Sequence, residues 1–403
     1  MSCNTYLKIL FVHPNFPGQF KHLAKAAVKC NHEVYFLCQT HFRREIHGLT
    51  RLTLKGDFGD KALKSKKLSI LDRTKYQSEQ FREGYINLRN NGWVPDIVIS
   101  HSGFGSGLYI KEIWPTTHHI SYLEWWFNPL SEFFTYDENN HDIGINRGSI
   151  KKHYDRNLYL SLELCCSDKI VSPTFWQRSQ LPSVLKKSCT VIFDGIDLSK
   201  FQSAFVNDKS TPILTYGTRG MDPIRAFPQL IKSLPKILQT NKKLRVEIAG
   251  NAESFYGSAP KGFSNWKEWA LDFLENEQIE RRVIWKGYMK EEAYIDWLRS
   301  SWCHLYFSHP FVTSWSLLEA LAIGIPIVAS NTEAVTEICE GCEGVELADH
   351  RSTNEIVTGA IRAIEKFCYR KKNAYRRNLK HYSVEDSLNR WEAVAGVELT
   401  TLN

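Results

Sequence analysis

Short apolar runs alternate along this chain with helix-like patterns, and they do so in two successive series. Such alternation is typical of parallel βαβ units, in which each helix returns the chain to the same edge of a sheet. The first series has strand-like runs at Leu7–Val12, Glu33–Leu37, Asp96–Ser100, His119–Glu124, Lys169–Ser172 and Thr190–Phe193. The second has them at Ile213–Gly217, Leu244–Gly250, Val283–Gly287, His304–Ser308 and Pro326–Ser330. We therefore predict an α/β protein with two doubly wound domains.

The two series divide near residue 200. The polar segment Ser199–Thr211 separates them, and 403 residues suit two domains of ordinary size. We expect a first domain at 1–198 and a second at 199–380, facing each other across a cleft. Near the end, Ser383-Val-Glu-Asp386 looks like a capping box, and Val384, Leu388, Trp391 and Ala395 then repeat at helical spacing. We predict that this helix packs back on the first domain, which residues 381–403 would complete.

Composition and cysteine usage argue against several classes of protein. Hydrophobic residues make up 43% of the chain and charged residues 24%, which is ordinary for a globular protein. The start shows no signal-peptide pattern, and the best candidate for a membrane span, Leu317–Ser330, is interrupted by Glu319. Ten cysteines without regular spacing suit reduced thiols, so we expect a cytoplasmic protein. Cys339-Glu-Gly-Cys342 is a lone C-x-x-C, either a zinc or redox site or a loop with two incidental thiols.

Candidate binding residues follow the strands, because ligands of open α/β sheets bind beyond the carboxyl ends of the strands. After the first strand, His13-Pro-Asn-Phe-Pro-Gly18-Gln-Phe leads into a helix, whose unpaired N–H groups suit an anion; a tight turn is the alternative. One glycine is not the dinucleotide fingerprint G-x-G-x-x-G, so NAD binding is not supported. Arg219 and Arg225 follow Ile213–Gly217. Their guanidinium forks suit phosphate oxygens, unless they are solvated surface arginines.

The segment His309–Ser330 carries the strongest local feature. It opens with Pro, Thr and Ser residues that can expose backbone amides, and a helix with an embedded carboxylate follows. Glu319 lies among leucines and alanines, and a carboxylate in such company needs hydrogen-bond donors. Ribose hydroxyls, nearby backbone amides or an arginine would serve.

Phe311–Ser330 resembles the donor-binding signature of retaining glycosyltransferases of the GT-B fold, family 4 in the sequence-based grouping. Phe16-Pro-Gly-Gln-Phe20 is similar to the N-terminal motif of one subgroup of that family. Further segments that match the subgroup are His101-Ser-Gly-Phe-Gly105, Glu124-Trp-Trp-Phe127, Ser172-Pro-Thr-Phe-Trp-Gln-Arg178, Asp194-Gly-Ile-Asp197 and Thr218-Arg-Gly-Met-Asp-Pro-Ile-Arg225. The resemblance implies a GT-B fold of two Rossmann-like domains, with an acceptor-binding domain at 1–198 and a nucleotide-sugar donor-binding domain at 199–380.

By the same resemblance, Arg219 and Arg225 would hold the donor diphosphate and serve catalysis, and Glu319 would hold the ribose hydroxyls. The family's other motif glutamate falls at Phe311, which leaves contacts with the donor sugar to the hydroxyls and backbone of the following residues. The expected donor-site residues besides these are Gly18, Tyr288, Thr313, Ser314, Trp315, Ser316 and Leu317.

Glu124 falls where many relatives have a histidine near the reacting sugar, and the resemblance implies a positioning or electrostatic role for it. A buried structural carboxylate is the alternative. His101, Phe104, Trp125 and Trp126 would lie on the acceptor side, although one of the two adjacent tryptophans should point into the core because neighbours on a strand face opposite ways.

Sugar transfer from a nucleotide donor requires stabilisation of the leaving diphosphate as its charge develops. Metal-dependent transferases use a divalent ion bound by Asp-x-Asp, a motif that this sequence does not have at a strand end. Two arginines and helix N-terminal dipoles can replace the ion. We therefore expect a metal-independent enzyme that needs no cofactor beyond its nucleotide-diphosphate-sugar substrate. The resemblance to the family implies that the anomeric configuration is retained.

Two basic runs bear on the acceptor, in a chain of net charge +7. Residues 51–75 include Arg51, Lys55, Lys61, Lys64, Lys66, Lys67, Arg73 and Lys75, and the second run is Arg370, Lys371, Lys372, Arg376, Arg377 and Lys380. They suit solvated helix faces, an anionic membrane surface that presents a lipid-linked acceptor, or a phosphate backbone.

Three functions stay open on the sequence. The first is a transferase of polysaccharide, lipopolysaccharide or glycolipid synthesis, cytoplasmic or peripheral at the inner face of a membrane, with a saccharide or lipid-linked acceptor. The second is a transferase acting on modified (hydroxymethylated) DNA bases of a phage. The third is a non-catalytic GT-B protein that binds nucleotide, which the presence of Arg219, Arg225 and Glu319 disfavours.

Overall fold

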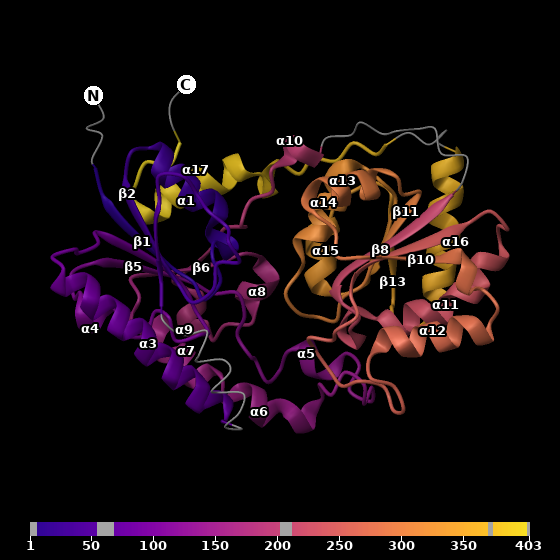
Figure 1. The fold of residues 1–403 in the computed structure, drawn as a ribbon, viewed down its shortest axis with the longest axis horizontal. Coiled ribbons are helices and arrows are strands. Elements are labelled where there is room, and N and C mark those ends of the chain that lie inside the picture. The colour runs from indigo at the N-terminus through magenta and orange to yellow at the C-terminus, as the bar shows by residue number, and fades with distance from the viewer. Residues whose placement is uncertain (1–5, 55–67, 202–211, 370–373, 401–403) are drawn as a thin grey trace. The chain divides into compact units, whose positions relative to one another are not determined.

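The computed structural model describes residues 6–54, 68–201, 212–369 and 374–400. The chain divides into two compact units. Unit 1 comprises Met1–Ser131, Ile150–Gly195 and Lys380–Asn403, and unit 2 comprises Glu132–Ser149 and Ile196–Leu379. Each unit has one parallel sheet with helices on both faces (Figure 1). The predicted α/β fold with two doubly wound, Rossmann-like domains is confirmed.

Within the described residues, the sheet of unit 1 has seven parallel strands in the order β3-β2-β1-β4-β5-β6-β7. The strands are β1 (Lys8–Val12), β2 (Glu33–Cys38), β3 (Thr50–Thr53), β4 (Ile97–His101), β5 (His118–Tyr122), β6 (Lys169–Ser172) and β7 (Cys189–Val191). The strand order reverses between β1 and β4, so the chain leaves these two neighbours in opposite directions. Such a switch point opens a crevice at the carboxyl ends of the strands, and His13 and His101 stand there.

The helices of unit 1 cover both faces of this sheet. They are α1 (Lys21–Lys29), α3 (Ile70–Asn90), α4 (Ile110–Ile113), α6 (Ile150–Tyr154), α7 (Asn157–Cys166), α8 (Phe175–Ser179), α9 (Ser183–Lys186) and α17 (Val384–Ala395). Side chains of β1 alternate between the two layers. Ile9 and Phe11 join a core cluster with α1 and α17, whereas Leu10 and Val12 join one with α3 and α4.

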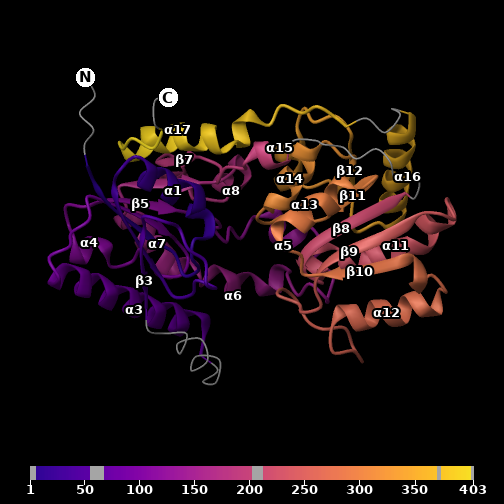
Figure 2. The same cartoon turned by 45° about the horizontal axis from the view of Figure 1, so that its top comes forward.

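The terminal helix α17 packs on the first unit, as predicted from its spacing. Its N-cap Ser383 accepts a hydrogen bond from the Asp386 N–H at 3.1 Å. Trp391 and Ala395 are buried in the same cluster as α1. Figures 1 and 2 both draw α17 beside α1, although more than 350 residues of sequence separate the two helices.

Within the described residues, the sheet of unit 2 has six parallel strands in the order β10-β9-β8-β11-β12-β13. The strands are β8 (Ile213–Gly220), β9 (Arg245–Asn251), β10 (Val283–Gly287), β11 (Cys303–Tyr306), β12 (Ile327–Ser330) and β13 (Val345–Ala348). Here the order reverses between β8 and β11. Arg219 near the end of β8, Arg225 after it, and Ser308 and His309 after β11 therefore stand at the second switch point.

The helices of unit 2 are α5 (Glu132–Thr135), α10 (Leu198–Phe201), α11 (Phe227–Gln239), α12 (Trp266–Asn276), α13 (Glu291–Arg299), α14 (Trp315–Ile323), α15 (Glu333–Cys339) and α16 (Thr353–Tyr369). The layer of α11, α12 and α16 buries the largest apolar cluster of the unit against one face of the sheet. Helices α13, α14 and α15 lie on the other face (Figure 1).

The structure differs from the sequence expectations in its strands and in its division into units. Strands β3 and β13 were not predicted, because Thr50–Thr53 lies in a polar, basic stretch and Val345–Ala348 follows a glycine-rich loop. The units meet at residues 195 and 196, close to the predicted division at 198. Residues 132–149, predicted in the first domain, belong to unit 2, so the chain passes from one unit to the other four times.

Candidate functional site

Arg219 stands near the carboxyl end of β8, exposed to solvent. The ladder between β8 and β9 shifts register between Gly217 and Gly220. A Cβ at Gly220 would lie 2.3 Å from the Glu253 carbonyl oxygen, so only glycine fits this approach. The guanidinium carbon of Arg219 lies 4.0 Å from the centre of the Phe255 ring, a cation–π contact. Arg219 is therefore presented at the strand end on an aromatic support.

Asp222 lies near Arg219 and Arg225, the two arginines that the sequence singled out. Its Oδ1 accepts hydrogen bonds from the N–H groups of Phe255 (2.7 Å) and Tyr256 (3.0 Å), which fixes the loop that carries Phe255. Burial raises the pKa of Asp222, and the nearby charges of Arg225 and Arg219 partly offset that shift. The Arg225 N–H donates to the Asp222 carbonyl at 3.0 Å, and Arg219 lies over the ring of Phe255, whose N–H donates to the Asp222 carboxylate. Through these contacts with Asp222 the structure brings Arg219 and Arg225 to the same edge of the sheet.

Arg225 is held by the neighbouring strand. Its Nη1 donates to the Ser308 Oγ at 2.6 Å, beyond the end of β11. The Tyr306 hydroxyl hydrogen-bonds to Arg225 and accepts the Ser314 N–H at 2.9 Å. Ser314 is the N-cap of α14 and its hydroxyl accepts from the Ser316 N–H. Arg225 therefore lies close to the positive N-terminal end of a nine-residue helix, an arrangement that favours an anion.

Glu319 lies half-buried on α14, beside Tyr294 of α13. Tyr294 is half-buried as a residue, and burial of its hydroxyl followed by the charge of the adjacent Glu319 carboxylate raises the pKa of that hydroxyl well above the ordinary value. Tyr294 is thus a polar neighbour of this carboxylate within the same unit. Tyr294 was missed in the sequence, because its role depends on the packing of α13 against α14.

The remaining predicted donor-site residues have different positions. Trp315 is 41% exposed at the first turn of α14 and Ser316 is half-buried. The Thr313 hydroxyl donates to the Ala334 carbonyl at 2.9 Å. Leu317 is a correction: its side chain is fully buried and its N–H donates to the Ser314 carbonyl, so it belongs to the core. Tyr288 is 76% exposed at the end of β10, separated from β8 by β9.

Phe311, at the place of the expected glutamate, packs among aromatic side chains of unit 2. Its ring centre lies 5.4 Å from that of Phe133 and 6.1 Å from that of Tyr256. Phe133 belongs to the segment 132–149. That segment therefore contributes to the surroundings of the predicted donor motif.

In unit 1, the turn after β1 links His13 to Glu124. The His13 Nδ1 accepts the Asn15 N–H at 2.8 Å, which assigns the ring hydrogen to Nε2. That Nε2 lies 2.9 Å from the Gln19 Oε1, and the Gln19 Nε2 donates to the Glu124 Oε1 at 2.8 Å. Gly18 has φ +51° beneath the His13 ring, where a Cβ would come within 2.6 Å of Nε2. The motif around Gly18 thus builds a polar chain that ends on Glu124.

His101, at the end of β4, faces the same carboxylate. The side chain of His101 is 2% exposed, and its Nδ1 donates to the Ser102 carbonyl at 3.0 Å, which leaves Nε2 with a lone pair 3.7 Å from the Glu124 Oε2. Burial lowers the pKa of His101 to about 4 and raises that of Glu124. The Glu124 side chain is 33% exposed. This accessible carboxyl group can therefore exchange a proton or a hydrogen bond with a hydroxyl-bearing ligand.

The other acceptor-side predictions divide between surface and core. Phe104 is half-buried, with its ring centre 5.4 Å from that of His101. Trp125 and Trp126 are both buried, and Trp126 joins a core cluster with Leu160 and Leu164. Trp126 is therefore a core residue and not part of an acceptor surface. Of the basic runs, Lys55, Lys61, Lys64, Lys66, Lys67, Arg370, Lys371 and Lys372 lie outside the described residues.

The lone C-x-x-C pair consists of one buried thiol, Cys339, and one half-buried thiol, Cys342. Cys339 is buried at the end of α15, and burial raises the pKa of its thiol to about 12. Burial also raises the pKa of Cys342. Because the thiolate is the metal ligand and the nucleophile, these shifts disfavour both uses. In the part of the chain that the structure describes, no group of three or more His, Cys, Asp or Glu side chains is arranged to hold a metal ion.

Two family models match consecutive parts of the sequence. Residues 30–201 match the model described as Glycosyl transferase family 4 group, and residues 204–380 match Glycosyl transferases group 1. Comparison with the curated proteins gives no match. Of the helices that the structure describes, none is long and apolar enough to cross a membrane.

Solved structures share the fold over nearly the whole chain. Sucrose-phosphate synthase from Thermosynechococcus elongatus is similar with a TM-score of 0.67 at 13% identity, covering 96% of each chain. HepE from Anabaena, in complex with UDP and glucose, has a TM-score of 0.66 at 13% identity, covering 97% of this chain and 100% of its own. A glycosyltransferase from Rickettsia africae has a TM-score of 0.63 at 11% identity, covering 97% and 98%.

At these identities the structural likeness concerns the fold, and the two family models add the domain types. The doubly wound sheets, the matched domains and the fold of the solved structures agree with one another. This chain is a glycosyltransferase of the GT-B type, with a family 4 group domain followed by a group 1 domain.

Proposed function

We propose that this chain transfers a sugar from a nucleoside-diphosphate sugar to an acceptor hydroxyl, with retention of the anomeric configuration and without a metal ion. The position of Arg219 and Arg225 at one edge of the unit 2 sheet, with the N-cap Ser314 of α14 bonded to Tyr306 of the strand that holds Arg225, supports this proposal. Charge develops on the leaving diphosphate in the transition state, and preorganised cations and helix N–H groups stabilise it. The complexes of HepE with UDP and UDP-glucose support a nucleotide-sugar donor.

Glu319 would bind the donor ribose. Its carboxylate lies beside Tyr294, and the two oxygens of a carboxylate can accept hydrogen bonds from two neighbouring hydroxyl groups of a sugar. Thr313, Ser314, Trp315 and Ser316 lie next to it along the chain and would contact the donor through hydroxyl groups and backbone. The predictions for Gly18 and Tyr288 are retained as peripheral contacts.

Unit 1 would bind the acceptor, with His101 and Phe104 beside it and Glu124 near the reacting carbon. Because its pKa is raised and Gln19 holds one oxygen, Glu124 would orient the acceptor hydroxyl and oppose the positive charge that develops on the transferred sugar. The acceptor class that we favour is a saccharide or lipid-linked saccharide of polysaccharide, lipopolysaccharide or glycolipid synthesis.

The first experiment titrates the protein with UDP, GDP and ADP by calorimetry in the presence of EDTA. We expect one of the three to bind, and Arg219→Ala to weaken that binding and nearly abolish transfer while the circular dichroism spectrum is unchanged. Arg281→Ala is the matched control, because the Arg281 side chain is also in unit 2 and 94% exposed but lies before β10.

Unimpaired turnover in Arg219→Ala would contradict the assignment of the diphosphate site. Binding that requires Mg²⁺ and disappears with EDTA would contradict metal independence alone. Retention is tested separately, by the proton coupling constant of the new anomeric centre in the product.

A further inference from the structure

A continuous line of hydrogen bonds crosses four neighbouring strands of unit 2 at their carboxyl ends. Arg225 donates to the Ser308 Oγ at 2.6 Å, and the Ser308 N–H donates to the Ser330 Oγ at 2.8 Å. The Ser330 Oγ lies 2.8 Å from the His350 Nδ1. These residues follow or end β8, β11, β12 and β13, which are adjacent in the sheet. The line therefore runs from an arginine of the candidate site to the edge of the sheet.

The three residues of the line beyond Arg225 are buried and uncharged. They are Ser308, Ser330 and His350, each at most 2% exposed. Burial lowers the pKa of His350 to about 3, so the imidazole is neutral near pH 7 and retains one lone pair. Because the Ser330 oxygen already accepts the Ser308 N–H, its own hydrogen is available for the His350 Nδ1. That arrangement fixes the rotation of Ser330 and the backbone of Ser308.

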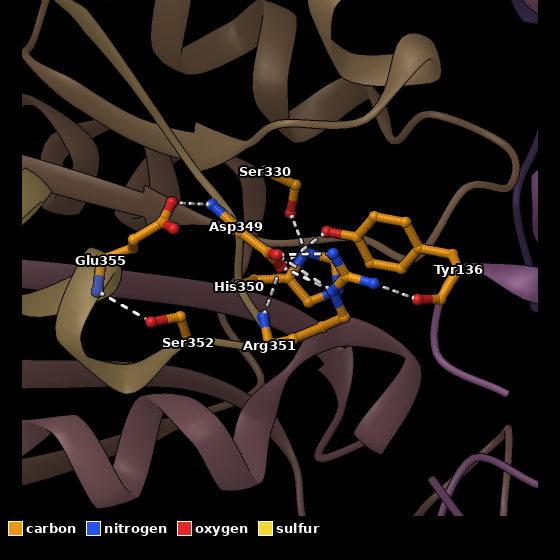
Figure 3. A network of polar contacts seen from close by, with 7 residues as sticks. All are labelled: Tyr136, Ser330, Asp349, His350, Arg351, Ser352 and Glu355. Atoms are coloured by element: carbon orange, nitrogen blue, oxygen red, sulfur yellow. Dashed lines mark hydrogen bonds and ion pairs between the residues drawn. The ribbon is translucent and has the colours of Figure 1, made fainter. Parts of the chain in front are cut away.

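Tyr136, from the segment 132–149, packs against the His350 end of the line (Figure 3). The Tyr136 ring lies 5.1 Å from the His350 ring, and its hydroxyl donates to the Asp349 Oδ1 at 3.0 Å. The Arg351 guanidinium carbon lies 4.2 Å from the centre of the Tyr136 ring, and Arg351 pairs with Asp349 at 2.6 Å. His350 is thus held between two charged neighbours that are paired with each other and with Tyr136.

We infer that Ser308, Ser330 and His350 are positioning residues that aim the Arg225 guanidinium at the donor diphosphate. An arginine side chain that is held before an anion arrives loses less conformational entropy on binding. Ser308 holds Nη1, and Ser330 with His350 holds Ser308. None of the three inner residues needs to touch the donor. The inference depends on the proposed function, in which Arg225 binds the diphosphate.

The competing interpretation is that His350 only completes the core. The chain offers a matched control for that role in His304, which is fully buried in the same unit. The His304 Nδ1 also lies within hydrogen-bond distance of a hydroxyl, 2.9 Å from the Thr215 Oγ1, and burial lowers its pKa to about 3 as well. His304 has no place in the line from Arg225.

The test compares His350→Leu, His350→Asn and His304→Leu, each alone and combined with Arg225→Ala. UDP, GDP and ADP are titrated against the unsubstituted protein, and the tightest binder is used throughout. We expect His350→Leu to weaken its binding about tenfold and to raise the donor KM more than it lowers kcat. His350→Asn, which keeps a polar group near the Nδ1 position, should recover most of the affinity.

In the Arg225→Ala background, where Arg219 still provides some affinity, His350→Leu should cause no further loss of binding. His304→Leu should lower the melting temperature but leave the affinity of the folded protein unchanged. Equal losses of affinity in His350→Leu and His304→Leu, or a loss from His350→Leu that persists in Arg225→Ala, would overturn the positioning role. If the unsubstituted protein binds none of the three nucleotides, the proposed function fails first and the inference fails with it.

Discussion

Glu124 and His101 face each other across 3.7 Å with pKa values moved in opposite directions by the same cause. Burial disfavours the charged form of any group, so it raises the pKa of the carboxyl and lowers that of the imidazole. His13 shows the same effect more strongly, since burial and the nearby His101 both lower its pKa. Burial therefore acts against the charged form at all three groups.

The substitution Glu124→Gln should lower kcat by about a hundredfold, because an amide cannot exchange a proton or offer a negative charge to the reacting sugar. The dissociation constant of the nucleoside diphosphate should change little, since Arg219 and Arg225 stand in the other unit. Steady-state kinetics and calorimetry on the same preparation measure the two effects. Glu112→Gln, an exposed carboxylate paired with Arg82, is the control. A loss of affinity with preserved kcat would make Glu124 a binding residue.

Gly18→Ala tests the turn that carries Gln19. Both the φ of +51° and the contact of 2.6 Å with the His13 Nε2 oppose a Cβ here. We expect a loss of about 2–3 kcal/mol in the free energy of unfolding by urea, together with lower turnover as Gln19 shifts from Glu124. Gly92→Ala isolates the backbone effect, because Gly92 has φ +75° with open space around it, and should cost about 1 kcal/mol. Equal losses would remove His13 from the explanation.

Helix α17 is the element on which the first unit most depends for closure. It begins at the N-cap Ser383, ends at Gly396 in the left-handed conformation, and buries Trp391 and Ala395 against β1 and α1. The hydroxyl of Ser387 on the same helix donates to the Phe193 carbonyl at 2.6 Å, near the end of the unit's second stretch. The helix, which lies in the third stretch of its unit, thus contacts both the first and the second.

Trp391→Ala should lower the free energy of unfolding of unit 1 by about 3–5 kcal/mol, because a large buried ring is lost and the cavity is only partly refilled. Differential scanning calorimetry should show the transition of unit 1 shifted and that of unit 2 retained. Trp266→Ala is the counterpart, since Trp266 is 3% exposed like Trp391 but lies in the core of unit 2. A common shift of both transitions in both variants would show that the units do not unfold separately.

The whole molecule contains many titratable groups in its interior. Among the described residues, burial lowers the pKa of eight histidines: His13 well below its ordinary value, His381 below it, and the others to about 3 or 4, namely His101, His119, His153, His304, His309 and His350. Glu163 is the opposite case, because burial raises its pKa to about 8 even though the Gly107 N–H donates to it at 2.9 Å. Stability should therefore depend on pH at both ends of the neutral range.

Below about pH 6.5 the histidines of the unfolded chain bind protons, whereas the buried histidines of the folded protein stay neutral, so stability falls as pH falls. Above about pH 6.5 the folded protein still holds the Glu163 proton that the unfolded chain has released, so stability also falls as pH rises to about 8. We expect the melting temperature to peak near pH 6.5. In Glu163→Gln the decline between pH 6.5 and 8 should largely disappear, and the rise in stability from about pH 4.5 to 6.5 should become steeper, because Glu163 contributes between its unfolded pKa of 4.5 and its folded pKa of about 8. Thermal unfolding from pH 4.5 to 9 measures both effects. An unchanged alkaline slope would contradict the protonated Glu163.

The sequence predicted the elements wherever an apolar run was bounded by turn residues. Strands β6 and β10 have the expected bounds, because Lys169–Ser172 and Val283–Gly287 are such runs. Strand β3, by contrast, reads Thr-Arg-Leu-Thr, and its strand character comes from pairing with β2. The placement of residues 132–149 in unit 2 depends on contacts of Phe133 and Tyr136 with residues far along the chain, which no local pattern records.

The site was predictable to the extent that it follows the ends of strands. Arg219 and Arg225 were singled out by that rule, Glu319 by its apolar surroundings, and Glu124 through the family resemblance. Gln19 and Ser308 were missed as site residues, because each acts through a hydrogen bond to a side chain remote in sequence, and Tyr294 was missed because it reaches Glu319 only through the packing of two helices. Polar residues at strand ends or on helices are common, and only the three-dimensional structure shows which of them contact a functional group.

The fourfold passage of the chain between its units has a consequence for how the protein is made. On the ribosome, unit 2 has all of its residues once Leu379 has emerged, whereas unit 1 still waits for the residues of α17. Unit 1, whose synthesis begins first, is therefore completed last. A gene cut near codon 198 would yield a first piece that lacks the helix α17 of its own unit. That piece would still carry residues 132–149, which belong to unit 2. Any attempt to express the halves separately should graft residues 380–400 onto the first and transfer 132–149 to the second.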